Sequence, residues 1–246
     1  MTKLNIRLHL IINVILCCLL FSCGDDYNSS GRNSSSQSHD YGPKDKNSTL
    51  QDKYQNNDFS SSLGDGSNRW IWQKPNLIIE HLEPLENKVV ADIGAGPYGY
   101  FSLRIAHQTS VKKVIAMDID NEAIEFMERA RKLLPGEIQS RFESRLVESN
   151  NAMLRPNEAD VVLIVNTSSY FENRVQYFKD LLRGIVSGGK LVVIDFKKKN
   201  TPVGPNVDER ISLGQIEQDL KEAGYKKINS DDRTLDYQYI VTAYKE

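Results

Sequence analysis

The chain has 246 residues, of which 39% are hydrophobic and 26% are charged. These fractions are ordinary for a soluble globular protein and leave room for one domain with extensions. Its 31 basic and 33 acidic side chains give a formal net charge of −2, so we expect no nucleic-acid partner. All three cysteines lie in the first 23 residues, which excludes a disulfide, a thiolate metal site or a cysteine nucleophile from the rest of the chain.

The N-terminus has the pattern of an export signal. Two basic residues precede the apolar run Leu10–Phe21, which is shorter than the roughly 20 residues that a transmembrane helix needs. We therefore expect a signal peptide over residues 1–22. The sequence Leu20-Phe21-Ser22-Cys23 resembles the lipobox of bacterial lipoproteins. The resemblance implies a lipid on Cys23 that anchors the protein to a membrane, facing the periplasm or the cell exterior. The alternative is an uncleaved N-terminal anchor.

Residues 23–66 are rich in serine, asparagine, aspartate and glycine and contain few aliphatic side chains. Such a segment buries too little apolar surface to offset the entropy that is lost on ordering, so we expect a disordered tether. We expect the folded domain to span residues 67–246.

Within this domain, the hydrophobic pattern alternates between helices and strands. The first half predicts, in chain order, helix Pro75–Glu83, strand Lys88–Ile93, helix Gly99–Gln108, strand Lys113–Asp118, helix Asn121–Leu134 and a weaker strand within Ile138–Val147. The second half predicts strand Ala159–Val165, helix Asn173–Val186 closed by Gly188-Gly189, strand Lys190–Phe196, helix Ser212–Ala223, and a hairpin of Lys226–Ser230 and Tyr237–Tyr244. This order predicts an α/β fold with a doubly wound, mostly parallel seven-stranded sheet and a C-terminal antiparallel hairpin.

A glycine-rich turn joins the first strand to the helix after it: Asp92-Ile93-Gly94-Ala95-Gly96-Pro97-Tyr98-Gly99. Glycines adopt positive φ and let the backbone approach a ligand closely. The next strand ends in Asp118, 19 residues after Gly99, where a carboxylate can accept hydrogen bonds from both hydroxyls of a ribose. The turn and the acid together predict a nucleoside-binding cleft.

Two cofactor classes use such a cleft. The glycine spacing and the distant acid also fit a nicotinamide dinucleotide, which would make the protein an oxidoreductase. Asp92 favours the other class, because the strand of the dinucleotide fingerprint is apolar up to its turn.

From about Arg69 to Glu246 the chain resembles the class I S-adenosylmethionine-dependent methyltransferases. Four motifs carry the resemblance, in the order and at the spacings of that family: Asp92-Ile-Gly94-Ala-Gly96, Val114-Ile-Ala-Met-Asp118, Asp160-Val-Val-Leu-Ile and Ser187-Gly-Gly-Lys-Leu191. The last motif has serine where the family usually has proline. The resemblance implies S-adenosylmethionine as the cofactor and methyl transfer as the reaction.

The resemblance also implies roles for single residues. Asp92 and the glycines would line the methionine moiety, Asp118 would bind the ribose, and Ile119 would pack on the adenine. Glu148 matches the usual partner of the adenine amino group, and Ser149 is the alternative. The full cofactor-binding set is then Asp92, Gly94, Ala95, Gly96, Gly99, Asp118, Ile119 and either Glu148 or Ser149.

The turn departs from the family's common G-x-G-x-G pattern. Pro97 and Tyr98 separate its last two glycines, so the loop is one residue longer. One hypothesis is that the longer loop changes the direction of the turn and that Tyr98 covers or blocks the part of the site that would hold the methionine moiety.

Two further segments each have a functional and a structural interpretation. The segment Arg69-Trp70-Ile-Trp72-Gln73 is either a lid, formed by Arg69, Trp70 and Gln73, or an aromatic plug at the sheet edge. The segment from Asn166 to Tyr170 follows the fourth strand, where the methyl acceptor binds in the family. Asn166 and Tyr170 either contact the acceptor, or the segment caps the following helix.

The sequence contains no recognisable catalytic residue and no metal-ligand spacing. Methyl transfer requires neither, because it depends on aligning the nucleophile with the methyl group. The absence of an Asn-Pro-Pro-aromatic motif and of cysteine in the domain leaves a small molecule or a protein side chain as the expected acceptor. Export conflicts with a cofactor that is made in the cytoplasm. The alternative to a membrane-tethered methyltransferase is therefore a catalytically inactive, exported binding module.

Overall fold

The computed structural model describes residues 69–246 of the chain. The signal peptide, the lipidation of Cys23 and the tether that the sequence predicts lie outside these described residues. Among residues 69–246, no helix combines the length and the apolar character that crossing a membrane would need.

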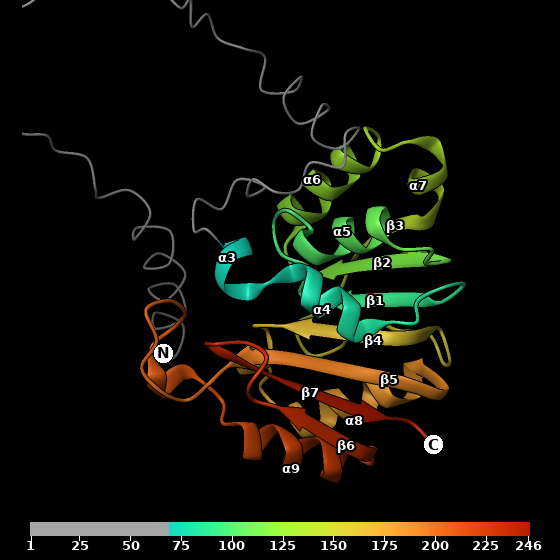
Figure 1. Cartoon of the computed structure of the whole chain (residues 1–246). Coiled ribbons are helices and arrows are strands. Elements are labelled where there is room, and N and C mark those ends of the chain that lie inside the picture. The colour runs from blue at the N-terminus through green and yellow to red at the C-terminus, as the bar shows by residue number, and fades with distance from the viewer. Residues whose placement is uncertain (1–68) are drawn as a thin grey trace, which may run out of the picture. The chain divides into compact units, whose positions relative to one another are not determined.

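A seven-stranded sheet forms the centre of the domain. Its strands are Val89–Ile93 (β1), Lys113–Asp118 (β2), Phe142–Leu146 (β3), Ala159–Val165 (β4), Ile185–Phe196 (β5), Lys226–Asp231 (β6) and Gln238–Tyr244 (β7). In space their order is β3-β2-β1-β4-β5-β7-β6 (Figure 1). Strands β1 to β5 are parallel, and β7 is antiparallel to both β5 and β6. The predicted mostly parallel sheet with a closing hairpin is confirmed.

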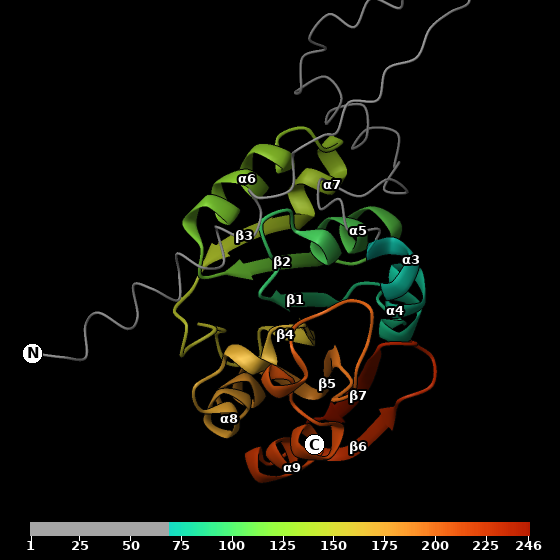
Figure 2. The same ribbon diagram turned by 90° about the vertical axis from the view of Figure 1, so that its left-hand side faces the viewer.

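Helices cover both faces of the sheet (Figures 1 and 2). They span Arg69–Gln73 (α3), Pro75–Leu82 (α4), Tyr100–Gln108 (α5), Asn121–Arg131 (α6), Gly136–Arg141 (α7), Arg174–Gly184 (α8) and Leu213–Ala223 (α9). Buried residues of α4, α5 and α6 pack on one face of the sheet, and those of α8 and α9 pack on the other. Because both faces are covered, the central strands are nearly continuous runs of valine, isoleucine, leucine and alanine.

Local signals explain where several helices begin and end. Asp120, Asn173 and Ser212 each accept a hydrogen bond from an amide in the first turn of α6, α8 and α9, respectively. These caps satisfy amides that have no partner within the helix. Gly224 ends α9 with a φ of 104°, a left-handed conformation that glycine adopts without strain.

Two expected helix ends are wrong. The helix predicted to reach Leu134 ends at Arg131, and a separate short helix, α7, begins after Pro135. The helix predicted to reach Val186 ends at Gly184, because Ile185 is fully buried and already pairs with β4 as the first residue of β5. The glycines at 188 and 189 therefore lie within β5, where the register between β4 and β5 shifts, instead of closing the helix.

Candidate cofactor-binding site

The glycine-rich turn after β1 is fitted closely against the end of β4. Gly94 has a φ of 72°, and a Cβ atom here would lie 2.5 Å from Oγ1 of Thr167. The amides of Gly94 and Ala95 donate to the carbonyl oxygen of Met117 at 2.8 and 3.0 Å, which ties the turn to β2. Glycine is therefore required at position 94 by both its backbone conformation and its neighbour.

The turn lines a cavity of about 510 Å³ at the carboxyl ends of the parallel strands. This volume falls in the range of small-molecule binding sites, and the position is where open α/β sheets bind ligands. The cavity brings together most of the site residues predicted from the sequence: Arg69, Asp92, Gly94, Ala95, Gly96, Asp118, Ile119, Ser149, Asn166 and Tyr170.

Asp118 is held at the cavity by two backbone amides. Its Oδ2 accepts from the amide of Gly96 at 2.8 Å, and its Oδ1 accepts from the amide of Asp120 at 3.0 Å. A carboxylate oxygen has two acceptor positions, so each oxygen can accept one further hydrogen bond from a ligand hydroxyl. The loop thus fixes the orientation of the group that the sequence predicts to bind a ribose.

Asp92 is a buried acid in the wall of the same cavity. Its side chain is 2% exposed, and Oγ of Ser102 donates to its Oδ2 at 2.6 Å. Burial raises the pKa of Asp92 to about 6, against the opposing effects of the Ser102 hydrogen bond and of the positive charge of Arg69. A cationic ligand group beside this carboxylate would stabilise its ionised form and offset the cost of burying the charge.

Four predicted residues do not line the cavity. The first is Glu148. Its neighbour Ser149 does line the cavity, which favours the serine as the residue that contacts the adenine. Gly99 instead caps α5 with a φ of 55° and packs beside Met127. Trp70 is 46% exposed and Gln73 is fully buried, and neither side chain reaches the cavity.

The longer glycine loop leaves the cavity open. The Tyr98 ring packs edge-on against Phe126 of α6, with 5.2 Å between the ring centroids. Pro97 lines the cavity and Tyr98 does not, contrary to the hypothesis that this tyrosine covers the methionine end.

Helix α3 combines the two roles that the sequence left as alternatives. Arg69 reaches the cavity, as a lid residue would, and its Nε donates to Oε1 of the buried Gln73. Trp72 packs against Phe196 at the end of β5 with 5.4 Å between the ring centroids, as a plug would.

The segment after β4 supplies the remaining wall. Asn166 adopts a φ of 56°, and its Oδ1 accepts from Nε2 of Gln238 on β7 at 2.7 Å. Tyr170 is 77% exposed at the cavity. The stacked rings of Phe171 and Tyr177, 3.9 Å apart, also line it. The sequence did not single out these two aromatics. Phe171 follows the end of β4 within a few residues, which was a usable signal, whereas Tyr177 lies within α8 and gave none.

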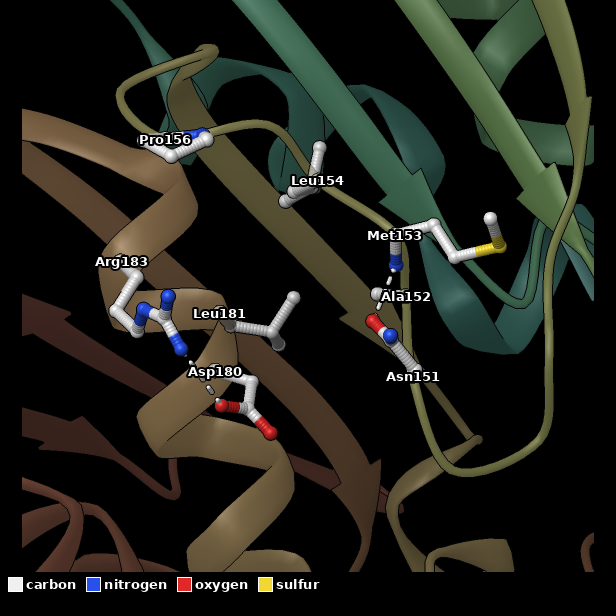
Figure 3. Close-up of a pocket in the computed structure, with 8 residues that line it drawn as sticks. All are labelled: Asn151, Ala152, Met153, Leu154, Pro156, Asp180, Leu181 and Arg183. Carbon is white, nitrogen blue, oxygen red and sulfur yellow. Dashed lines mark hydrogen bonds and ion pairs between the residues drawn. The ribbon is translucent and has the colours of Figure 1, made fainter.

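A second cavity of about 400 Å³ lies between the chain before β4 and helix α8 (Figure 3). Arg183 and Asp180 of α8 form an ion pair there at 3.8 Å. The amide of Met153 donates to Oδ1 of Asn151 at 2.7 Å on the opposite wall. No residue that the sequence predicts to be functional lines this cavity, so the first cavity is the candidate site.

Residues 91–193 match the model of the methyltransferase domain family. The strand order, with the antiparallel β7 between β5 and β6, is also that of solved methyltransferase structures. The fold is that of the class I methyltransferases. The dinucleotide fold has no antiparallel seventh strand beside its fifth strand, which argues against the oxidoreductase alternative. No curated protein sequence matches the chain.

Three solved structures illustrate the range of proteins with this fold. A SAM-dependent methyltransferase from Aquifex aeolicus is 23% identical, with a TM-score of 0.63 over 73% of this chain and 93% of that chain. Phosphoethanolamine N-methyltransferase 2 from Haemonchus contortus is 15% identical, with a TM-score of 0.58 over 71% of this chain and 52% of that longer chain. A "possible exported protein" from Bordetella parapertussis is 14% identical, with a TM-score of 0.56 over 70% of this chain and 67% of that chain. At these identities the likeness shows the fold alone.

Proposed function

We propose that the domain binds S-adenosylmethionine and transfers its methyl group to a small-molecule acceptor. The observation that carries this proposal is the single cavity in which the glycine turn, Asp92 and Asp118 meet. The family match supports the cofactor, and so does the Haemonchus enzyme, whose structure is a complex with S-adenosyl-L-methionine.

The residues of the cavity fit the parts of this cofactor. Asp118 would accept the ribose hydroxyls while it keeps its two amide donors. Ionised Asp92 would face the ammonium group of the methionine moiety. A Cβ atom added at Gly96 would meet no atom within 4 Å, so the space beside this residue is open to a ligand. Ile119, which is 62% exposed at the cavity, offers an apolar surface for the adenine.

The bound cofactor supplies a methyl group on a sulfonium, and transfer then depends on how the acceptor is aligned. The Asn166 side chain, which accepts from Gln238, would orient the acceptor, and Tyr170 lines the same cavity. Because a cavity of about 510 Å³ must hold the cofactor as well, we expect the acceptor to be small.

Calorimetric titration of the full-length chain with S-adenosylmethionine and S-adenosylhomocysteine tests cofactor binding. Asp118→Ala should weaken the binding of both ligands by about 10- to 100-fold, because it removes the charged carboxylate that would accept hydrogen bonds from the ribose hydroxyls. The matched control is Asp208→Ala, which removes an exposed carboxylate outside the cavity and should bind as the wild type does. Failure of the folded wild-type chain to bind either ligand would refute the proposal.

Transfer itself needs a separate assay. Release of S-adenosylhomocysteine would be measured with small amine, hydroxyl and carboxylic-acid acceptors. Tight cofactor binding with no release for any acceptor would favour the alternative, an inactive binding module.

We also propose that a lipid on Cys23 tethers the domain to a membrane on its periplasmic or outer side. The lipobox-like sequence Leu20-Phe21-Ser22-Cys23 supports this proposal. Cys23→Ala should abolish both lipid labelling and recovery in the membrane fraction. Cys17→Ala is the control. Cys17 has no small residue before it, so this variant should still be labelled at Cys23. Unchanged labelling of Cys23→Ala would contradict the tether.

A further inference from the structure

Arg69 is a positively charged residue that lines the candidate site and lies outside the glycine motif. It is the first residue of α3, which lies where the parallel strands end (Figures 1 and 2). Its side chain lines the same cavity as Asp92 and lies close enough to influence the pKa of that acid. Beside the glycine turn the cavity therefore has the positive side chain of Arg69 and two acids, of which Asp118 is already held by the amides of Gly96 and Asp120.

The guanidinium of Arg69 is held in place before any ligand arrives. Its Cζ lies 4.1 Å from the centroid of the Tyr100 ring and 5.7 Å from that of Phe101. Its Nε donates to Oε1 of Gln73, a side chain that is fully buried. A guanidinium that is stacked and hydrogen-bonded loses little freedom when its fork of donors takes up a carboxylate.

Opposite charges in the wall of one cavity are complementary to an α-amino acid, whose ammonium and carboxylate are joined by one carbon. We propose that Arg69 binds the carboxylate of the cofactor's methionine moiety while Asp92 receives its ammonium. This inference rests on the proposed function. It makes α3 a lid that the amino-acid end of the cofactor holds in place, and it gives Gln73 the role of orienting Arg69 from outside the cavity.

A truncated ligand isolates this contact. 5′-Methylthioadenosine keeps the adenosine and the sulfur of S-adenosylhomocysteine and lacks the amino-acid group. Calorimetry on the full-length chain would compare both ligands with wild type, Arg69→Gln and Arg69→Lys. The matched control is Arg183→Gln, which removes an exposed arginine from the wall of the second cavity.

We expect Arg69→Gln to weaken the binding of S-adenosylhomocysteine by about 10-fold or more and to leave the affinity for 5′-methylthioadenosine unchanged. Arg69→Lys should recover part of the loss, since it keeps the charge without the planar fork. Unchanged binding of 5′-methylthioadenosine also shows that the variant is folded. Arg183→Gln should bind both ligands as the wild type does.

Tryptophan fluorescence gives a second readout of the lid. The chain has two tryptophans, and both of them, Trp70 and Trp72, lie in α3. Their emission should change when S-adenosylhomocysteine binds to wild type, and change much less with 5′-methylthioadenosine or in Arg69→Gln.

The outcomes separate the inference from the function on which it rests. If wild type binds S-adenosylhomocysteine and Arg69→Gln binds it equally well, the assignment of Arg69 is wrong and the proposed function stands. Equal weakening of both ligands would make Arg69 a structural residue of the cavity wall. A loss of transfer activity with unchanged affinity for both ligands would place Arg69 on the acceptor instead. If wild type binds neither ligand, the proposed function fails with the inference.

Discussion

Replacing Gly94 by alanine tests whether the turn is fitted against the end of β4 as tightly as its geometry indicates. Two costs add at this position. A φ of 72° is left-handed, which costs a residue with a Cβ about 1–2 kcal/mol. The new Cβ would also lie 2.5 Å from Oγ1 and 2.7 Å from Cγ2 of Thr167, a contact that forces a shift costing about 1–3 kcal/mol.

The expected loss in the free energy of unfolding is therefore about 2–5 kcal/mol. For a domain of this size that corresponds to a melting temperature lower by about 4–20 °C. Gly96→Ala is the matched control. It has a similar φ of 77°, but its Cβ would meet no atom within 4 Å, so only the backbone cost of about 1–2 kcal/mol applies.

Thermal and denaturant unfolding of the full-length chain would measure both variants. The double variant Gly94→Ala/Thr167→Ala should recover part of the loss, because it removes the two closest atoms and leaves the backbone strain. Equal melting temperatures for the alanine variants at 94 and 96, or no recovery in the double variant, would refute the argument that Thr167 confines the turn.

Three further predictions concern buried acids and the longer loop. Burial raises the pKa of Asp195 to about 6, so the folded state holds its proton more tightly and stability falls as pH rises from about 4 to about 6. Asp195→Asn should therefore stabilise the domain by up to about 3 kcal/mol near pH 7 and have little effect near pH 4, as measured by denaturant unfolding. Since Asp92 must be ionised to receive an ammonium, calorimetry should find S-adenosylhomocysteine binding weaker below about pH 6. Tyr98→Ala should lower the melting temperature through its lost contact with Phe126 and leave ligand affinity unchanged.

Each of these has a clear contrary result. Equal destabilisation by Asp195→Asn at both pH values would show that its carboxylate has a structural role that the amide cannot fill. Binding that is independent of pH would separate Asp92 from the ammonium. A large loss of ligand affinity in Tyr98→Ala would show that this side chain contacts the ligand after all.

Much of the site could be predicted because its signals are local. The run from Asp92 to Gly99 joins a strand to a helix, and the strand that follows ends in Asp118, so both must reach the same edge of a parallel sheet. The order of apolar strands and amphipathic helices predicted the sheet with its closing hairpin for the same reason. These features depend on backbone conformation and hydrophobic period, which neighbouring residues in the chain determine.

Other features depend on which way a side chain points and on what lies opposite it. The sequence could not choose between Glu148 and Ser149, because only packing decides which of two consecutive residues faces the cavity. The same holds for Tyr98, which turns toward α6. Likewise, the two glycines after Val186 look like a helix stop, and only the pairing of Ile185 with β4 ends α8 earlier.

The sequence by itself thus determined the fold, the glycine turn and the acid that meets it, because these are properties of consecutive residues. The tertiary structure decided that Arg69 enters the cavity while its hydrogen-bond partner Gln73 stays buried behind it. It also decided that the aromatic pair of Phe171 and Tyr177 completes the wall. Which side chains face the cavity depends on how α3 and the segment after β4 pack against the sheet, and no local propensity records that packing.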